Sequence, residues 1–207
     1  MLTVLKYAIQ DISEFSREDL EKSFLCMRDA RKAKVERFQN ETSKQCTLAG
    51  EWLVRGLLAE VTGKPGESFT ICADEKGKLH AENTPGLFFN ISHSGSKVAA
   101  AVCDERVGVD IEVLRPVSLK LAKRVCTVEE LLYVFGRTPA ETDFEDETNP
   151  ECIRRFFEVW TAKEAYFKCI GTGITGFDAM QSLPADFKKI KIENEVYIMH
   201  IVTLNEV

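Results

Sequence analysis

The stretch GLFFNISHSGSKVAAAVCDERVGVDIEV, residues 86–113, decides the fold. Its apolar runs at 86–92 and 97–102 predict two strands joined by a short turn, and 106–113 predicts a third strand. The connection between the second and third strands is too short for a helix. We therefore place a boundary between two halves of the chain near 104–106.

The two flanks of this stretch resemble each other in the order of their elements. Upstream, the patterns predict a strand, two amphipathic helices and a strand, at 1–10, 17–39, 42–63 and 68–73. Downstream, they predict two helices and a hairpin turning at Glu193-Asn194, at 118–135, 153–170 and 189–204. We therefore predict an α+β protein of two α/β subdomains, residues 1–105 and 106–207, with one shared interface.

Composition and charge exclude several classes of protein. The chain has 207 residues and a net charge of −6, which argues against a general nucleic-acid binder. The longest apolar run, VAAAVC at 98–103, is too short to span a membrane, and no signal-peptide pattern is present. The seven cysteines are odd in number and scattered, without a CxxC pair, which argues against zinc and a disulfide framework. We expect a cytoplasmic protein.

Two carboxylates stand at alternate positions of the third strand. Side chains alternate along a strand, so Asp110 and Glu112 share one face while Val109 and Ile111 turn to the core. Two carboxylates this close repel each other unless a cation lies between them, and Mg²⁺ prefers such oxygen ligands. The alternative is a strand whose polar face is simply solvated.

The helix predicted at 153–170 adds a third carboxylate. Trp160, Glu164 and Lys168 are spaced i, i+4, i+8 and therefore share one stripe of the helix. Glu164 could complete a metal site while the Lys168 ammonium meets a phosphate oxygen. The alternative is an ordinary pair within the helix between Glu164 and Lys168, which stabilises a helix by a few tenths of a kcal/mol, about 0.2–0.5.

Two further segments are suited to anions. Ser92-His93 stands at the end of a predicted strand, and the chain has no GxSxG elbow, so an anion-binding turn fits better than a hydrolase nucleophile. In the basic segment 27–38, Arg31 and Lys34 share a helix face and could form a binding site for a polyanion. The alternatives are a purely structural turn and a solvated surface. GTGITG at 171–176 lacks GK[ST] and is interpreted as a helix C-cap and turn.

Together these segments resemble the 4′-phosphopantetheinyl transferases, in the larger type built as a pseudo-dimer within one chain. The family pattern G-[VI]-D-x-E corresponds to residues 108–112, and W-x-x-K-E-[AS]-x-x-K corresponds to 160–168. The upstream element F-N-[IV]-S-H-[ST] corresponds to 89–94. The three ordered motifs cover the chain from about 75 to 175, and the first half matches more loosely.

The resemblance implies a fold and a reaction. The fold is two subdomains related by pseudo-twofold symmetry in a monomer. The reaction transfers the phosphopantetheine arm of coenzyme A to a serine of an acyl or peptidyl carrier protein and releases adenosine 3′,5′-bisphosphate. It serves fatty-acid, polyketide or nonribosomal-peptide synthesis and uses Mg²⁺, with Mn²⁺ as an alternative. Two other readings remain: a non-catalytic module that binds coenzyme A or a carrier, and a different Mg²⁺-dependent phosphoryl-transfer enzyme.

The resemblance also implies residue roles. The metal ligands would be Asp110, Glu112 and Glu164. Glu164 would also accept the serine proton, Lys168 would add positive charge at the pyrophosphate, and Glu130 falls where some relatives carry an extra acid that could act as the base. Lys78 would lie beside the adenine of coenzyme A, and the basic helix and His93 would bind its 3′-phosphate. The full set of residues implied to bind coenzyme A is Arg31, Lys34, Lys78, Ser92, His93, Lys163 and Lys168.

Three departures from the family pattern stand out. Leu79 follows Lys78 where relatives have proline, and Cys46 replaces an arginine that contacts the nucleotide phosphates, with Arg28 or Lys44 able to compensate. The acidic segment 141–151 lengthens the spacing between motifs; we predict a solvated loop that points away from the carrier, because carriers of this kind are themselves acidic.

Overall fold

The protein contains two three-stranded antiparallel sheets. This computed structural model describes residues 4–75, 77–140, 146–172, 182–184 and 187–204. The first sheet has the order β1-β5-β4, with β1 at Leu5–Asp11, β4 at Phe88–Ser94 and β5 at Lys97–Cys103. The second has the order β6-β10-β9, with β6 at Arg106–Val113, β9 at Lys188–Glu193 and β10 at Tyr197–Leu204.

Helices flank the sheets. Those of the first half are α1 (Arg17–Cys26), α2 (Asp29–Glu36) and α3 (Glu41–Thr62), with short 3-10 turns η1 (Ile12–Glu14) and η2 (Gly66–Ser68). Those of the second half are α4 (Leu119–Val125), α5 (Val128–Phe135) and α6 (Pro150–Ile170). Two small ribbons pair β2 (Ile71–Ala73) with β3 (Leu79–Ala81) and β7 (Val117–Ser118) with β8 (Asp146–Glu147). None of the described helices is long and apolar enough to cross a membrane.

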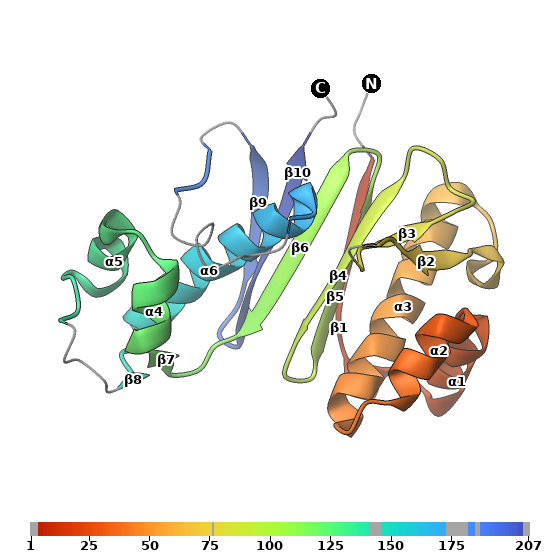
Figure 1. The fold of residues 1–207 in the computed structure, drawn as a ribbon, viewed down its shortest axis with the longest axis horizontal. Coiled ribbons are helices and arrows are strands. Elements are labelled where there is room, and N and C mark those ends of the chain that lie inside the picture. The colour runs from red at the N-terminus through yellow and green to blue at the C-terminus, as the bar shows by residue number, and fades with distance from the viewer. Residues whose placement is uncertain (1–3, 76, 141–145, 173–181, 185–186, 205–207) are drawn as a thin grey trace.

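The long helices and the sheets form successive layers, with α3 outside the first sheet and α6 outside the second (Figure 1). Alternation along β5 explains the arrangement. Val98, Ala100 and Val102 join the apolar cluster of α3, whereas Ala99 and Ala101 join a cluster that β6 and β10 complete from the second sheet. The two sheets therefore share a buried apolar layer.

A glycine allows α6 to lie close to β6. A Cβ on Gly108 would fall well under 3.0 Å from the carbonyl oxygen of Ala165 and the amide of Cys169. Any side chain at this position would push the helix away from the strand. Gly108 therefore sets the distance between the strand that carries Asp110 and the helix that carries Glu164.

The strands predicted at 86–92, 97–102 and 106–113, the helix at 42–63 and the C-terminal hairpin are confirmed. The helices predicted at 17–39 and 118–135 are wrong in one respect, because each is two helices. The second breaks at Cys126-Thr127, where Thr127 and Glu130 form a capping box that starts α5. The first breaks at Met27, whose extended backbone (ψ 149°) ends α1.

Two smaller expectations also meet the structure. Gly171 caps α6 with φ +77°, as predicted, while residues 173–176 of the same motif lie outside the described residues. The acidic segment is not a loop throughout. Residues 146–147 pair with β7, and Asn149 caps α6, which begins at Pro150. Residues 141–145 lie outside the described residues, so the direction of this segment stays a prediction.

Candidate active site

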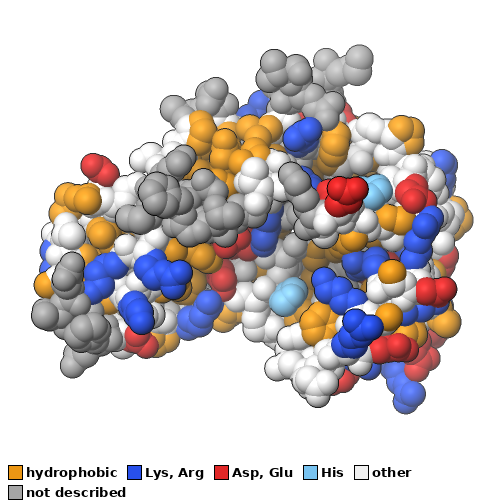
Figure 2. Space-filling model, in the orientation of Figure 1, with side chains coloured by type: hydrophobic (Ala, Val, Ile, Leu, Met, Phe, Trp, Pro, Cys, Tyr) orange, Lys and Arg blue, Asp and Glu red, His pale blue; other side chains and the backbone are white. Residues whose placement is uncertain are grey.

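Three elements meet around a polar cavity of about 300 Å³. Figure 2 shows acidic, basic and histidine side chains gathered in the hollow between the two halves. The residues that line the cavity come from β4, β6 and α6; they are Ile91, Ser92, His93, Asp110, Glu112, Trp160, Glu164 and Lys168. The structure thus brings together the predicted carboxylates, the predicted lysine and the Ser92-His93 pair. His93 lies within β4 and not on a turn, which corrects the sequence interpretation.

Asp110 is the most buried of the three carboxylates, with 4% of the residue exposed. The alternative of a solvated polar face is therefore wrong here, because α6 covers this side of β6. Its Oδ1 accepts from Lys168 Nζ (2.7 Å) and from Ser92 Oγ (2.8 Å). Burial raises the pKa of Asp110, and the Lys168 ammonium opposes that shift.

Glu112 is held on both of its oxygens. Oε2 accepts from Ser94 Oγ (2.6 Å) and Arg115 Nη1 (2.7 Å), and Oε1 accepts from Trp160 Nε1 (3.3 Å). The Arg115 side chain is about half exposed, so this ion pair contributes little stability. Its guanidinium also lies over the Phe157 ring, 4.8 Å from the centroid.

Glu164 faces the two strand carboxylates from α6. Burial raises its pKa first, and the nearby charges of Asp110 and Glu112 raise it further, while Lys168 lowers it. Like charges thus accumulate in this cavity beyond what Lys168 offsets. A cation would relieve that repulsion.

The donor set fits a hard divalent cation. Asp110 lines the cavity, and its Oδ2 is buried without a hydrogen-bond partner, so one carboxylate oxygen is left unsatisfied. Among the residues that the structure describes, however, no three His, Cys, Asp or Glu side chains are already grouped as a metal site. Lys168 and Arg115 instead occupy one oxygen each of Asp110 and Glu112. The predicted cluster is therefore not preassembled, and metal binding needs these cations to yield.

His93 lies at the rim of the same cavity. Partial withdrawal of its ring from water lowers its pKa, and the Lys168 ammonium lowers it further. Lys168 Nζ also donates to Ser92 Oγ at 3.0 Å. Ser92, His93 and Lys168 thus present a hydroxyl, an imidazole and an ammonium side by side, a combination suited to phosphate oxygens.

Lys163 and Glu130 lie together away from the cavity. Lys163 is 1% exposed, and its Nζ donates to Val125 O (2.8 Å) and Glu130 Oε2 (2.5 Å). The Glu130 carboxylate also accepts from the amide of Thr127 at the start of α5. Both side chains tie α5 to α6. The structure gives them a role inside the protein, and we leave them out of the proposed site.

The two predicted anion ligands of the basic helix α2 differ in their surroundings. Arg31 Nε and Nη2 both donate to Glu51 Oε2, at 2.9 and 2.6 Å, so an anion would have to compete with a buried carboxylate for this guanidinium. Lys34 is exposed and lines a separate cavity of about 520 Å³ with Arg37 and Phe38. Of the two predicted anion ligands, Lys34 is the accessible one.

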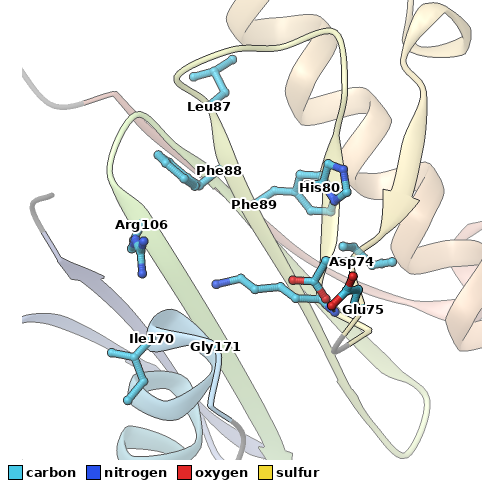
Figure 3. Close-up of a pocket in the computed structure, with 11 residues that line it drawn as sticks. Asp74, Glu75, His80, Leu87, Phe88, Phe89, Arg106, Ile170 and Gly171 are labelled. Carbon is cyan, nitrogen blue, oxygen red and sulfur yellow. The ribbon is translucent and has the colours of Figure 1, made fainter.

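A larger cavity of about 560 Å³ surrounds Lys78. Figure 3 shows His80 on β3 and Arg106 on β6 on opposite sides of it, with Phe88 and Phe89 between them. Lys78 Nζ donates to the carbonyls of Lys168 (3.1 Å) and Cys169 (3.0 Å) at the C-terminal end of α6. Burial lowers the pKa of Lys78. Lys78 thus links the two halves.

The two predicted substitutes for the arginine expected at Cys46 have neighbours elsewhere in the protein. Cys46 is buried, and its Sγ lies 3.5 Å from Gly95 O. Arg28 pairs with Glu82 at 2.6 Å, and Lys44 lines a different, apolar cavity between α1 and α3. Neither of the two predicted substitutes lines the polar cavity.

Sequence reasoning missed three residues that contact the carboxylate strand. Ser94 and Arg115 bind Glu112, and Asn90 Oδ1 accepts from Val109 N (2.9 Å). A signal was available for two of them, because Asn90, Ser92 and Ser94 alternate along β4 and must share one face. Arg115 lies beyond the strand and had no such signal.

Comparison with known proteins identifies the class. A model of the 4′-phosphopantetheinyl transferase superfamily matches residues 106–200, and a model of the N-terminal part of 4′-phosphopantetheinyl transferases matches residues 14–105. The two matches are consecutive and together cover most of the chain. The chain belongs to the 4′-phosphopantetheinyl transferase superfamily.

Three of the relatives illustrate the match. The 4′-phosphopantetheinyl transferase psf-1 of Bacillus pumilus is 34% identical over 145 residues, covering 70% of this chain and 58% of the relative. The 4′-phosphopantetheinyl transferase Sfp of Bacillus subtilis strain 168 is 27% identical over 190 residues, covering 91% and 77%. The gsp protein of Aneurinibacillus migulanus is 32% identical over 138 residues, covering 67% and 53%. The matches thus span just over half of the psf-1 and gsp proteins.

Proposed function

We propose that this protein transfers the 4′-phosphopantetheine moiety of coenzyme A to a serine of an apo acyl or peptidyl carrier protein, releasing adenosine 3′,5′-bisphosphate. The observation that carries the proposal is the cavity where β4, β6 and α6 meet. There an anion-binding group, Ser92 with His93, lies beside three carboxylates and Lys168. Relatives named 4′-phosphopantetheinyl transferase support it.

In this proposal the second half holds a metal ion. Asp110, Glu112 and Glu164 would bind Mg²⁺ or Mn²⁺, which when bound neutralises negative charge on a pyrophosphate. The unsatisfied Oδ2 of Asp110 supports the assignment. Lys168 leaves Asp110 and contacts the pyrophosphate, and the Glu164 carboxylate accepts the proton of the attacking serine hydroxyl. Both groups already line the cavity.

The first half holds the nucleotide. Ser92, His93 and Lys34 bind the 3′-phosphate: Lys34 is exposed and supplies positive charge, His93 lines the cavity, and the Ser92 hydroxyl exchanges its bond to Asp110 for one to the phosphate. Lys78 and the cavity around it receive the adenine, with Phe88 and Phe89 supplying the apolar lining. Arg31 contributes only where the anion competes successfully with Glu51.

The two halves, residues 1–105 and 106–207, are proposed to be subdomains related by approximate twofold symmetry. The same order of elements supports this: β1, α3 and the β4-β5 hairpin in one half, β6, α6 and the β9-β10 hairpin in the other. The sheet orders β1-β5-β4 and β6-β10-β9 also correspond strand by strand. Since one chain supplies both halves, the protein is expected to act as a monomer.

The test is a transfer assay read by mass. The protein is incubated with coenzyme A, Mg²⁺ and a panel of apo-carriers from fatty-acid, polyketide and nonribosomal-peptide systems, and each carrier is weighed intact. The expected result is a gain of one phosphopantetheine on at least one carrier, abolished by EDTA. Binding of coenzyme A without any mass gain across the panel would favour the non-catalytic module instead.

A further inference from the structure

The edges of the two sheets lie side by side without a backbone ladder between them. β4 is the edge of the first sheet and β6 the edge of the second, and within the described residues they belong to separate sheets (Figure 1). Side chains of β4 join them instead. Val109 N, Ile111 N and Val113 N donate, at 2.9, 3.4 and 3.1 Å, to oxygens of Asn90, Ser92 and Ser94 respectively.

Two of these side chains also hold the carboxylates. Ser92 Oγ donates to Asp110 Oδ1 (2.8 Å), and Ser94 Oγ donates to Glu112 Oε2 (2.6 Å). A hydroxyl has one donor and two acceptor positions. Each serine therefore accepts from the amide that follows a carboxylate residue and donates its single proton to that carboxylate. These two hydrogen bonds to one segment of β6 fix both the register of the strand and the direction of the carboxylate.

Of the two serines, Ser94 has fewer contacts that could confuse a test of its role in positioning a carboxylate. Ser92 lines the cavity and also contacts Lys168, so its loss would change several things at once. Ser94 is absent from the residues that line the cavity, and its contacts are with Glu112 and the amide of Val113. Any effect of Ser94 on the cavity therefore passes through Glu112 and the β6 backbone next to it.

We propose that Ser94 is a positioning residue that presents the Glu112 carboxylate to the divalent cation, an inference that rests on the metal site of the proposed function. Without the Ser94 hydroxyl, the Glu112 carboxylate keeps Arg115 as its strongest partner and turns toward it, away from the cavity. The amide of Val113 loses its partner at the same time. Residues that orient a metal ligand through a hydrogen bond typically change metal affinity by about 10- to 100-fold when mutated.

The chain offers a matched control for this position. Ser96 lies two residues further along, and its Oγ donates to the carboxylate of Asp11 at 2.5 Å. Ser96→Ala therefore removes the same kind of hydroxyl–carboxylate bond from the same hairpin, with no bond to β6. Ser94→Thr keeps the hydroxyl and serves as the conservative rescue.

The experiment measures binding of Mn²⁺ alone by isothermal titration calorimetry to the full chain and the three variants. Ser94→Ala is expected to weaken binding about 10-fold, while Ser94→Thr and Ser96→Ala stay within about twofold of the unmodified protein. Ser94→Ala should lower the midpoint of thermal unfolding at least as much as Ser96→Ala, because it also leaves the amide of Val113 without its partner. Coenzyme A binding without metal should be unchanged in Ser94→Ala, because Ser94 does not line the cavity.

The outcomes separate this inference from the proposed reaction. Equal Mn²⁺ affinity in Ser94→Ala and Ser96→Ala overturns the positioning role. Absence of Mn²⁺ binding to the unmodified protein overturns both the metal site and the role of Ser94. If the expected Mn²⁺ pattern is found but no carrier gains mass in the transfer assay, Ser94 keeps its role and only the proposed reaction fails.

Discussion

The helices α3 and α6 occupy corresponding places over their sheets, but their contacts differ in chemistry. α3 meets the first sheet through an apolar cluster that includes Val54, Leu58 and Val98. Its buried charges, Glu51 and Arg55, form an ion pair with each other. Glu51 also accepts from Arg31. Arg55 also donates to three backbone carbonyls outside the first sheet, those of Cys26, Gly66 and Phe69. α6 instead directs Glu164 and Lys168 toward the carboxylates of β6.

Each helix–sheet contact contains a glycine, but the glycine lies on the helix in one half and on the strand in the other. In the first half the glycine is on the helix, where a Cβ on Gly50 would lie 2.6 Å from the Cγ2 methyl of Ile91. In the second half it is on the strand, where a Cβ on Gly108 would collide with backbone atoms of α6. A side chain can rotate aside and a backbone cannot. The same architecture thus serves as a scaffold in one half and as a rigid wall of the cavity in the other.

The largest expected effect is the loss of transfer activity when the charge of Asp110 in the second half is removed. Asp110→Asn should lower transfer to a carrier by about a thousandfold, with folding retained, because it removes a charged ligand of the metal ion that neutralises charge on the pyrophosphate. Folding is retained because Lys168, the partner that is released, has a side chain that is 29% exposed and can reach water. The rate is measured as kcat/KM by carrier mass, alongside urea unfolding.

The corresponding charge in the first half should behave in the opposite way. Glu51→Gln leaves the Arg55 guanidinium, 1% exposed, without its carboxylate, and the free energy of unfolding should fall by about 2 to 3 kcal/mol. Transfer per folded molecule should stay within a few fold. Comparable loss of activity in both variants would remove the distinction between a structural charge on α3 and a catalytic charge on β6.

The paired glycines give the next effect. Gly108→Ala should reduce the free energy of unfolding by about 3 kcal/mol, at the upper end for an overpacked core, because backbone must move. Gly50→Ala should cost about 1 kcal/mol, since Ile91 can repack and alanine favours the helix. Urea unfolding of both variants measures the difference. Equal losses would mean that α6 shifts as easily as the Ile91 side chain.

The smallest effect concerns the link between the halves. Lys78→Met removes two hydrogen bonds to carbonyls at the end of α6 and should lower the free energy of unfolding by about 1 kcal/mol. Lys64→Met, at an exposed lysine after α3, is the control and should change little. Calorimetry with coenzyme A then tests the ligand role, since an unchanged dissociation constant in Lys78→Met would contradict contact with the nucleotide.

The sequence predicted the elements whose signals are local. Alternation located β6 and placed Asp110 and Glu112 on one face, and the spacing of Trp160, Glu164 and Lys168 placed them on one stripe; all five line the cavity. The break between α4 and α5 was also readable, because Thr127 followed three residues later by Glu130 is a capping-box pattern. That pattern already indicated a structural role for the Glu130 side chain.

Partners distant in sequence could not be predicted in the same way. Arg31 was expected at a phosphate, but its partner Glu51 is on another helix and becomes its neighbour only when α2 packs on α3. Lys163 was expected beside coenzyme A, yet neighbouring helix residues point in different directions. With Glu164 facing the cavity, Lys163 turns to the carbonyl of Val125. Tertiary packing decides the partner of Arg31, whereas helix geometry already turns Lys163 away from the side of Glu164.

The join between β4 and β6 has a mechanical consequence. A backbone ladder breaks cooperatively, and its groups cannot turn away without moving the chain. Here Asn90, Ser92 and Ser94 supply the bonds, and each can let go by rotation about its own χ1. The shared apolar layer still holds the two sheets together, so β6 can shift slightly beside the cavity without the halves separating, and its register returns when the bonds form again.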